Sequence, residues 1–211
     1  MAAVICPAVL ASDPHEYRDQ MEQVERFAGR VHIDVSDGRF APALTLRLDQ
    51  LWWPASLTAD LHVMYERPFD HLEIIKTLHP QLVIVHAESE GDFLGFAAEL
   101  HRHGMETGVA LLPETPVSLI EDALDAIDHV LIFSGRIGHF GGTADLQLLD
   151  KVRYLRGRKP ALEIGWDGGV NDLNIRELIH GGVDVLNAGG FIQESPHPEQ
   201  AYATLKKAIA G

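Results

Sequence analysis

Eight short apolar segments alternate along the chain with eight segments of helix-like composition. The predicted strands are Val4–Ala11, Val31–Asp37, Leu57–Met64, Leu82–His86, Thr107–Leu112, Val130–Ser134, Ala161–Asp167 and Val183–Ala188. The predicted helices are Pro14–Ala28, Pro68–Leu78, Gly91–His103, Pro116–Ile127, Ala144–Arg156, Asp172–His180 and Pro198–Ala210, and Thr45–Trp53 is a shorter helical or irregular piece. Because no strands or helices are grouped apart, the pattern predicts parallel strands covered by helices.

Eight strand–helix units favour one closed (β/α)₈ barrel, the TIM barrel of the α/β class. At 211 residues the chain is compact for this fold, which usually takes about 250 residues. An open doubly wound sheet is the alternative, but no G-x-G-x-x-G follows the first strand, which weakens a dinucleotide-binding version. Since no linker or low-complexity stretch interrupts the pattern, we expect a single domain over residues 1–211.

Composition narrows the partners and the compartment. The net charge of −14 argues against nucleic acid and against anionic membranes. No apolar run reaches the length of about 20 residues that spans a bilayer, and the first residues lack the basic region of a signal peptide. The single cysteine, Cys6, rules out an internal disulfide. We therefore expect a cytoplasmic protein. We also expect a homo-oligomer of undetermined subunit number.

The second predicted strand carries polar residues that packing does not explain. Residues i and i+2 of a strand point to the same face, so His32 and Asp34 point together, opposite to the apolar residues between them. A buried carboxylate is costly unless it is paired or binds a metal. Taken alone, the pair is better explained by a hydrogen bond inside a core, and other strands are needed to favour a metal site.

Other strands supply further polar residues where a barrel places its active site, at the carboxyl ends. The residues gathered in this way are His32, Asp34, Asp60, His62, His86, Glu88 and Asp167. Two imidazoles and two carboxylates among them (His32, His62, Asp34 and Asp167) make an N₂O₂ set that suits Zn²⁺, Fe²⁺ or Mn²⁺. Calcium prefers mostly oxygen ligands and is not favoured.

Three glycine pairs follow the last three predicted strands: Gly141 and Gly142, Gly168 and Gly169, and Gly189 and Gly190. Glycine lets backbone N–H groups approach an anion closely, and phosphate sites after strands seven and eight recur in barrels. One pair alone would be explained equally well by a tight turn. Three pairs on neighbouring loops favour phosphate binding.

Seven motifs lie in order along the chain: P-A-V-L-A-S-D at 7–13, H-I-D-V-S-D-G at 32–38, D-L-H-V-M at 60–64, V-H-A-E at 85–88, H-F-G-G at 139–142, D-G-G-V at 167–170 and A-G-G at 188–190. Along nearly its whole length the chain resembles the ribulose-phosphate 3-epimerase family. The family's corresponding motifs are P-S-I-L-x-A-D, H-x-D-V-M-D-G, D-V-H-L-M, V-H-x-E, G-F-G-G, D-G-G-V and A-G-S.

This resemblance implies a metal-dependent epimerisation at C3 of a ketose phosphate, D-ribulose 5-phosphate/D-xylulose 5-phosphate or a close relative. One divalent ion would be held by His32, Asp34, His62 and Asp167, and Asp34 and Asp167 would also be the acid and base. The substrate and its phosphate would contact Met64, Gly141, Gly142, Gly168, Gly169, Gly189 and Gly190. The chemistry requires such a set, because a metal stabilises the enediolate while two carboxylates exchange protons on opposite faces.

The chain departs from the family where the family contacts its substrate. Ala8 replaces a serine, Ser36 and Phe133 replace methionines, and Leu112 replaces an asparagine. The loop Ser134–His139 replaces S-V-N-P-G and is one residue longer, and its Arg136 and His139 are as compatible with a solvated loop as with a cover for the ligand. The departures leave the identity of the sugar more open than the class of chemistry.

Two other functions compete with this interpretation. The departures would also fit a non-catalytic relative that keeps metal or phosphate binding, although retention of all four predicted ligands argues against one, because unpaired buried charges are costly. A barrel decarboxylase or aldolase would need a lysine at a strand end. The lysines (Lys76, Lys151, Lys159, Lys206 and Lys207) all fall on predicted helices or loops.

Overall fold

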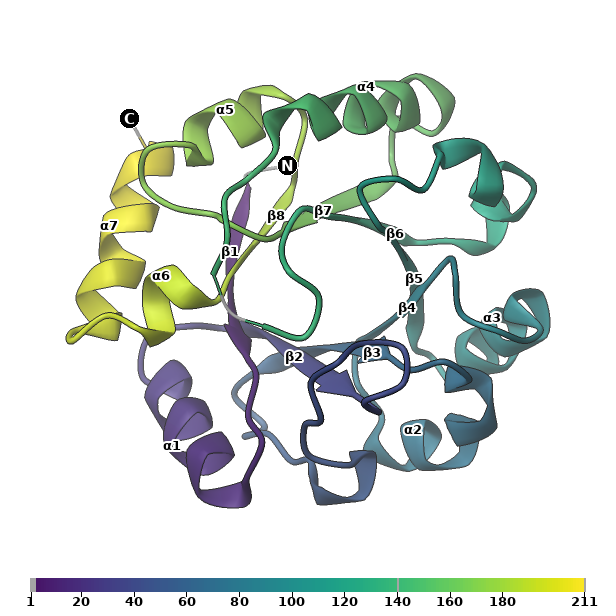
Figure 1. Ribbon diagram of the computed structural model, residues 1–211, viewed down its shortest axis with the longest axis horizontal. Helices are drawn as coiled ribbons and strands as arrows, with labels where there is room; N and C mark the ends of the chain where they lie inside the picture. Colours follow the sequence, from purple (N-terminus) through teal and green to yellow (C-terminus); the bar gives the residue numbers. More distant parts are fainter. Residues whose placement is uncertain (1–2, 140, 211) are drawn as a thin grey trace.

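The computed structural model describes residues 3–139 and 141–210, and these residues build a ring of strands surrounded by helices (Figure 1). The strands are β1 (Val4–Val9), β2 (Arg30–Ser36), β3 (Thr58–Met64), β4 (Leu82–His86), β5 (Glu106–Leu111), β6 (His129–Phe133), β7 (Glu163–Asp167) and β8 (Val185–Ala188). The α-helices are α1 (Pro14–Glu25), α2 (Leu72–Leu78), α3 (Phe93–Arg102), α4 (Leu149–Arg158), α5 (Ile175–His180), α6 (Gly190–Gln193) and α7 (Pro198–Ala210). The 3₁₀ helices are η1 (Leu48–Gln50), η2 (Pro68–His71), η3 (Val117–Ala126) and η4 (Leu146–Leu148).

The strands close into a barrel in chain order. Every neighbouring pair is parallel, and β1 pairs with both β2 and β8. Closure gives each strand a hydrogen-bonded neighbour on both sides, so the described strands form no open sheet edge. The predicted (β/α)₈ barrel is confirmed, and the open doubly wound sheet is wrong.

Local sequence explains most of the helix limits. Asp13 caps α1 by accepting hydrogen bonds from the backbone N–H groups of His15 and Glu16, and Pro14 occupies the first turn, where its missing N–H costs nothing. The segment predicted as an α-helix at Pro116–Ile127 is instead the 3₁₀ helix η3. Its buried residues Val117 and Ile120 are three apart, which matches three residues per turn.

Two further differences concern segments beside the candidate site. The predicted helix Ala144–Arg156 begins as η4 and becomes α-helical only at Leu149, ending at Arg158. The short helix α6, directly after β8, has no counterpart among the predicted helices. Its four residues include Gly190, whose low helix propensity hides such a turn from a sequence pattern.

Most of the apolar core lies between the strands and the helices. Inside the barrel the described residues form a small apolar cluster of Leu82, Ile84, Ala110 and Leu131. Many other positions whose side chains point inward are polar. Because interior positions of a small barrel are filled by side chains, these polar groups must satisfy one another or a ligand.

Toward the amino ends of the strands the interior holds an ion-pair network centred on Arg30. Its Nε donates to Asp60 at 2.8 Å, and its two terminal nitrogens donate to both oxygens of Glu163 at 2.9 Å. His129 Nδ1 lies 2.7 Å from the same carboxylate. Asp60 is only 1% exposed, so its charge depends on Arg30 for compensation.

No helix among residues 3–139 and 141–210 combines the length and apolarity that crossing a bilayer requires.

Candidate functional site

Four side chains meet at the carboxyl end of the barrel, and they are the four predicted metal ligands. One potential ligand atom from each of His32, Asp34, His62 and Asp167 lies within 4.8 Å of the other three. The closest approach is 2.8 Å, between His62 Nδ1 and Asp34 Oδ1. His32 Nε2 lies 3.3 Å from the same oxygen and 3.9 Å from Asp167 Oδ2.

Strand register explains why distant residues come together. Asp34 of β2 is paired with His62 of β3, so these side chains lie at the same height. His32 lies one inward-facing position below Asp34 on the same strand, and its ring reaches upward. Asp167 ends β7 on the other side of the barrel. The i, i+2 pattern of the sequence therefore predicts the correct face for His32, Asp34 and His62, and Asp167 was predicted from its place at the end of a strand.

His32 provides a test of whether this cluster fits a metal ion. The residue is completely buried, and neither ring nitrogen makes a hydrogen bond to the part of the chain that the structure describes. A buried imidazole without a partner is costly, whereas a nitrogen aimed at two carboxylates is suited to ligation. Two imidazole nitrogens and two carboxylate oxygens, all inward and nearly buried, are a donor set that could hold a divalent cation.

The pKa values of the two carboxyl groups of the cluster are shifted in opposite directions. Burial opposes the ionisation of Asp34, but His32 and His62 outweigh burial and hold the pKa of Asp34 below the usual range. Burial and the neighbouring Asp34 carboxylate raise the pKa of Asp167 to about 7. Carboxyl groups whose environments separate their pKa values in this way are typical of acid–base sites. Burial also lowers the pKa of His62 to about 4.

His62 is held from behind by a chain of polar side chains. Its Nε2 lies 3.0 Å from Nε2 of His86, and Nδ1 of His86 lies 3.4 Å from Oε2 of Glu88. Glu88 in turn accepts hydrogen bonds from the hydroxyl of Thr115 and from the backbone N–H of Leu112. His86 and Glu88, gathered with the strand-end residues from sequence, therefore support the cluster from outside it.

Asp60 was gathered with the same strand-end residues, but it does not join the cluster. It points into the barrel two residues before His62, and it pairs with Arg30 in the network below the site. Two residues span about 7 Å along a strand, which places Asp60 in a lower layer. Periodicity identified its face correctly but not its depth.

The three glycine pairs lie together around one pocket. The backbones of their loops pass so closely that side chains would collide. A Cβ on Gly168 would lie 2.1 Å from the backbone nitrogen of Gly135, and one on Gly169 would lie 2.2 Å from that of Ala144. A Cβ on Gly190 would lie 3.1 Å from the backbone nitrogen of Gly141. Glycine is therefore required at 168 and 169 for the loops to converge here, whereas a Cβ on Gly141 would meet no atom within 4 Å.

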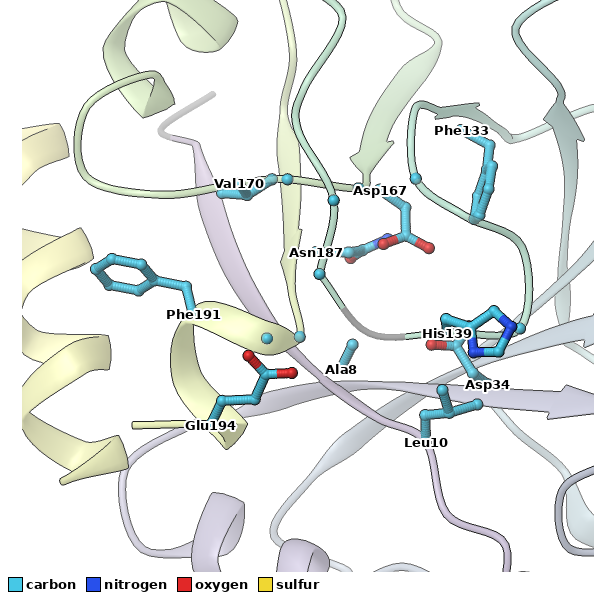
Figure 2. A pocket seen from close by; sticks show the side chains of 18 of the residues that line it. Ala8, Leu10, Asp34, Phe133, His139, Asp167, Val170, Asn187, Phe191 and Glu194 are labelled. Atoms are coloured by element: carbon cyan, nitrogen blue, oxygen red, sulfur yellow. The ribbon is translucent and has the colours of Figure 1, made fainter. Parts of the chain in front are cut away.

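This pocket has a volume of about 330 Å³ and opens beside the cluster (Figure 2). Its walls include Asp34, Asp167, Met64 and the six predicted glycines (Gly141, Gly142, Gly168, Gly169, Gly189 and Gly190). The predicted loop motif at 139–142 also includes Phe140, which lies outside the described residues. The loop residue His139 lines the pocket, whereas Arg136 is not among the lining residues.

No lysine lines this pocket within the described residues. Lys151 and Lys159 instead donate to backbone carbonyl groups beside η3. Lys151 donates to Leu112 and Thr115 in the loop before η3, and Lys159 donates to Leu124 and Ile127 at its carboxyl end. A Schiff-base aldolase or a lysine-dependent decarboxylase therefore lacks its central group among these residues.

The residues that depart from the family occupy different places. Ala8 and Phe133 line the pocket. The hydroxyl of Ser36 faces the loop that follows β2, 3.4 Å from the backbone N–H of Gly38. Leu112 contributes backbone groups, donating to Glu88 and accepting from Lys151. Only two of the four altered positions therefore bear directly on what the pocket accepts.

Sequence reasoning missed Asn187, which lines the same pocket. It is the polar residue of an otherwise apolar strand, two positions before Gly189. The spacing argument that identified His32 and Asp34 also applies to Asn187, so this signal was present in the sequence.

Comparisons with known proteins identify the family of the chain. The model of the ribulose-phosphate 3 epimerase family matches residues 4–193. A ribulose-phosphate 3-epimerase of Helicobacter pylori is 33% identical over 210 residues, covering 96% of each chain. The cytoplasmic isoform of ribulose-phosphate 3-epimerase from Oryza sativa subsp. japonica is 29% identical over 219 residues, covering 100% of this chain and 96% of that protein.

Solved structures support the fold. KGPDC from Streptococcus mutans superposes with a TM-score of 0.73 at 13% identity, covering 100% of this chain and 98% of that one. Orotidine 5'-phosphate decarboxylase from Pyrococcus horikoshii OT3 gives a TM-score of 0.71 at 16% identity, covering 99% and 100%. At these identities the likeness concerns the barrel alone.

Fold and site together define a barrel enzyme with its polar residues gathered at the carboxyl ends of the strands. Within that class, the chain belongs to the ribulose-phosphate 3-epimerase family and is an isomerase of that type.

Proposed function

We propose that the protein inverts C3 of a ketose phosphate, D-ribulose 5-phosphate/D-xylulose 5-phosphate or a close relative, with one bound divalent ion. The observation that carries this proposal is the convergence of Asp34 and Asp167 from different strands, with His32 and His62, on the mouth of a glycine-lined pocket. His32, Asp34, His62 and Asp167 would hold the ion, which is Zn²⁺, Fe²⁺ or Mn²⁺ by the chemistry of the donor set.

Epimerisation needs a proton removed from one face of C3 and another returned to the opposite face. A carboxylate oxygen of Asp34 accepts the C3 proton, and the electron pair of the broken C–H bond passes toward the neighbouring carbonyl. Asp167 then gives its own proton to C3 from the other side, and the two residues exchange roles in the reverse reaction. The geometry supports this division, because two carboxyl groups from different strands can serve opposite faces of C3, whereas one carboxyl cannot.

The divalent ion, when bound, supplies positive charge that stabilises the negative charge developing on the substrate oxygens. Met64 and Phe133 provide apolar walls that limit water near the exposed carbanion. The backbones of Gly141, Gly142, Gly168, Gly169, Gly189 and Gly190 would hold the phosphate, since no lysine or arginine of the described residues lines the pocket.

The reaction is tested with D-ribulose 5-phosphate in deuterated water. Protein stripped with a chelator is reloaded with each candidate ion, bound metal is measured by mass spectrometry, and exchange at C3 is followed by proton NMR. We expect deuterium at C3 of both epimers and about one ion per chain. Absence of exchange with every ion, on pentulose and hexulose phosphates alike, would refute the proposal.

A non-catalytic relative is the second candidate, favoured by the altered wall positions Ala8 and Phe133. Two variants separate it from the enzyme. If turnover is detected and disappears in both Asp34→Asn and Asp167→Asn, the non-catalytic function is excluded. We further propose a single domain that acts in the cytoplasm as a homo-oligomer. Light scattering of the purified protein tests the oligomeric state.

A further inference from the structure

Asn187 is a buried amide without a partner. Its side chain is on β8 and 1% exposed, and neither its oxygen nor its nitrogen makes a hydrogen bond within residues 3–139 and 141–210. Buried side-chain amides in native proteins are almost always hydrogen-bonded, and those that are not need an explanation. Asn187 lines a ligand pocket, so a bound ligand can supply the missing hydrogen-bond partner.

The position of Asn187 defines which part of a ligand it can reach. It is in register with Asp167 on β7, so the two side chains are neighbours, and they lie together in the pocket in Figure 2. Gly189 comes two residues after Asn187, just beyond the end of β8, and begins the part of the glycine-lined wall that follows this strand. The amide therefore lies between the carboxyl that would act at the reacting carbon and the backbone that would hold the phosphate.

Other polar side chains nearby are already occupied or face solvent. Asn171 donates to Gly169 and accepts from the backbone N–H groups of Leu173 and Asn174. Gln193 donates to the carbonyl of Ala8, whose own methyl side chain offers no hydrogen bond. Asn187 is the one amide of this wall, among the described residues, that retains both its donor and its acceptor.

We propose that Asn187 is a specificity residue that hydrogen-bonds the C4 hydroxyl of the substrate. This inference rests on the proposed function: with C3 beside Asp34 and Asp167 and the C5 phosphate on the glycine loops, C4 lies between them. An amide both donates to and accepts from one hydroxyl, and it cannot do either with a C4 methylene. A pocket built in this way rejects a 4-deoxy analogue, because the amide would be left buried and unpaired.

The test compares a pentulose 5-phosphate with its 4-deoxy analogue. In wild-type protein we expect kcat/KM for the deoxy compound to be about 10- to 100-fold lower, the range expected for leaving a buried polar group unpaired. Leucine has a similar volume and no polar side-chain atoms. In Asn187→Leu the kcat/KM values of the two compounds should therefore differ by less than about 3-fold, because the value for the parent compound falls. Asn187→Ala provides a second variant if leucine disturbs folding. Glu194→Gln, at an exposed carboxyl of the same wall, should keep the preference.

A binding measurement separates this inference from the proposed reaction. Calorimetry with the unreactive pentitol 5-phosphate and its 4-deoxy form reports recognition without turnover, and wild type should prefer the hydroxylated compound by a similar factor. Three results would overturn the assignment. Wild type could bind the two pentitols with equal affinity, the preference could survive in Asn187→Leu and Asn187→Ala, or it could disappear in Glu194→Gln. Failure of C3 exchange together with a retained pentitol preference would instead reject the epimerase and keep the C4 contact.

Discussion

Replacement of Arg30 by methionine tests the ion-pair network beneath the site. Arg30 is the partner of both Asp60 and Glu163, but the two carboxylates would be affected differently. Glu163 keeps His129 at 2.7 Å and is partly exposed. Asp60 is 1% exposed, and it would keep only the thiol of Cys6, 3.9 Å away. The loss therefore falls mainly on Asp60, which becomes an uncompensated buried charge.

Removing one partner of a buried ion pair costs about 3–5 kcal/mol. For a chain of this length each kcal/mol lowers the melting temperature by roughly 2–4 °C, so Arg30→Met should melt about 6–20 °C below wild type. Calorimetry and urea unfolding at pH 7 measure this difference. The deficit should shrink as the pH falls toward 5, because the unpaired Asp60 then takes up a proton in the folded state and loses its charge.

Two comparisons make the reasoning refutable. The double variant Arg30→Met/Asp60→Leu replaces the pair with apolar groups, and it should recover most of the lost stability. Arg47→Met, which breaks a solvent-exposed pair with Asp49, should leave the melting temperature unchanged within error. If Arg30→Met melts within about 2 °C of wild type, or the double variant is no more stable than the single one, Asp60 is not the origin of the cost.

The remaining predictions concern the site and its loops. Glu88→Gln should weaken metal binding by about 10- to 100-fold in a chelator competition, because Glu88 orients His86 and through it His62. Glu66→Gln, at a carboxyl whose side chain is 46% exposed, should not weaken metal binding. Gly168→Ala should destabilise the protein by more than about 2 kcal/mol in urea unfolding, because φ is +111° and the added Cβ meets the backbone of Gly135. As a control, Gly157 is exposed in α4 with open space around it, so Gly157→Ala should be neutral or stabilising. In metal-free protein the folded-state pKa of Asp167 is raised to about 7, so the folded state binds this proton more tightly than the unfolded state does. The free energy of unfolding of the wild type therefore falls as the pH rises from about 4 to 7. Asp167→Asn removes that loss, so unfolding experiments should show its advantage over wild type growing with pH, and a constant difference would contradict the raised pKa.

The sequence by itself determined the barrel and the face on which the site is built. Alternation of strand and helix segments has few physical solutions, and the period of two along a strand decides which side chains point inward. Together with the rule that a barrel forms its active site at the carboxyl ends of the strands, they were sufficient to gather His32, Asp34, His62 and Asp167 among seven candidate residues. The three glycine pairs were predicted separately, from the position of their loops after the last three strands.

Tertiary structure decided what depends on depth and on neighbours. The period of two assigns Asp60 and His62 to the same face, but only the register between strands puts one in the ion-pair network and the other in the site. The raised pKa of Asp167 and the lowered pKa of Asp34 arise from burial and mutual charge, which no single segment encodes. The unpaired amide of Asn187 became meaningful only when the surrounding groups were known to be occupied. Local pattern fixes direction, whereas distances between side chains follow from how separate strands are staggered in the closed barrel.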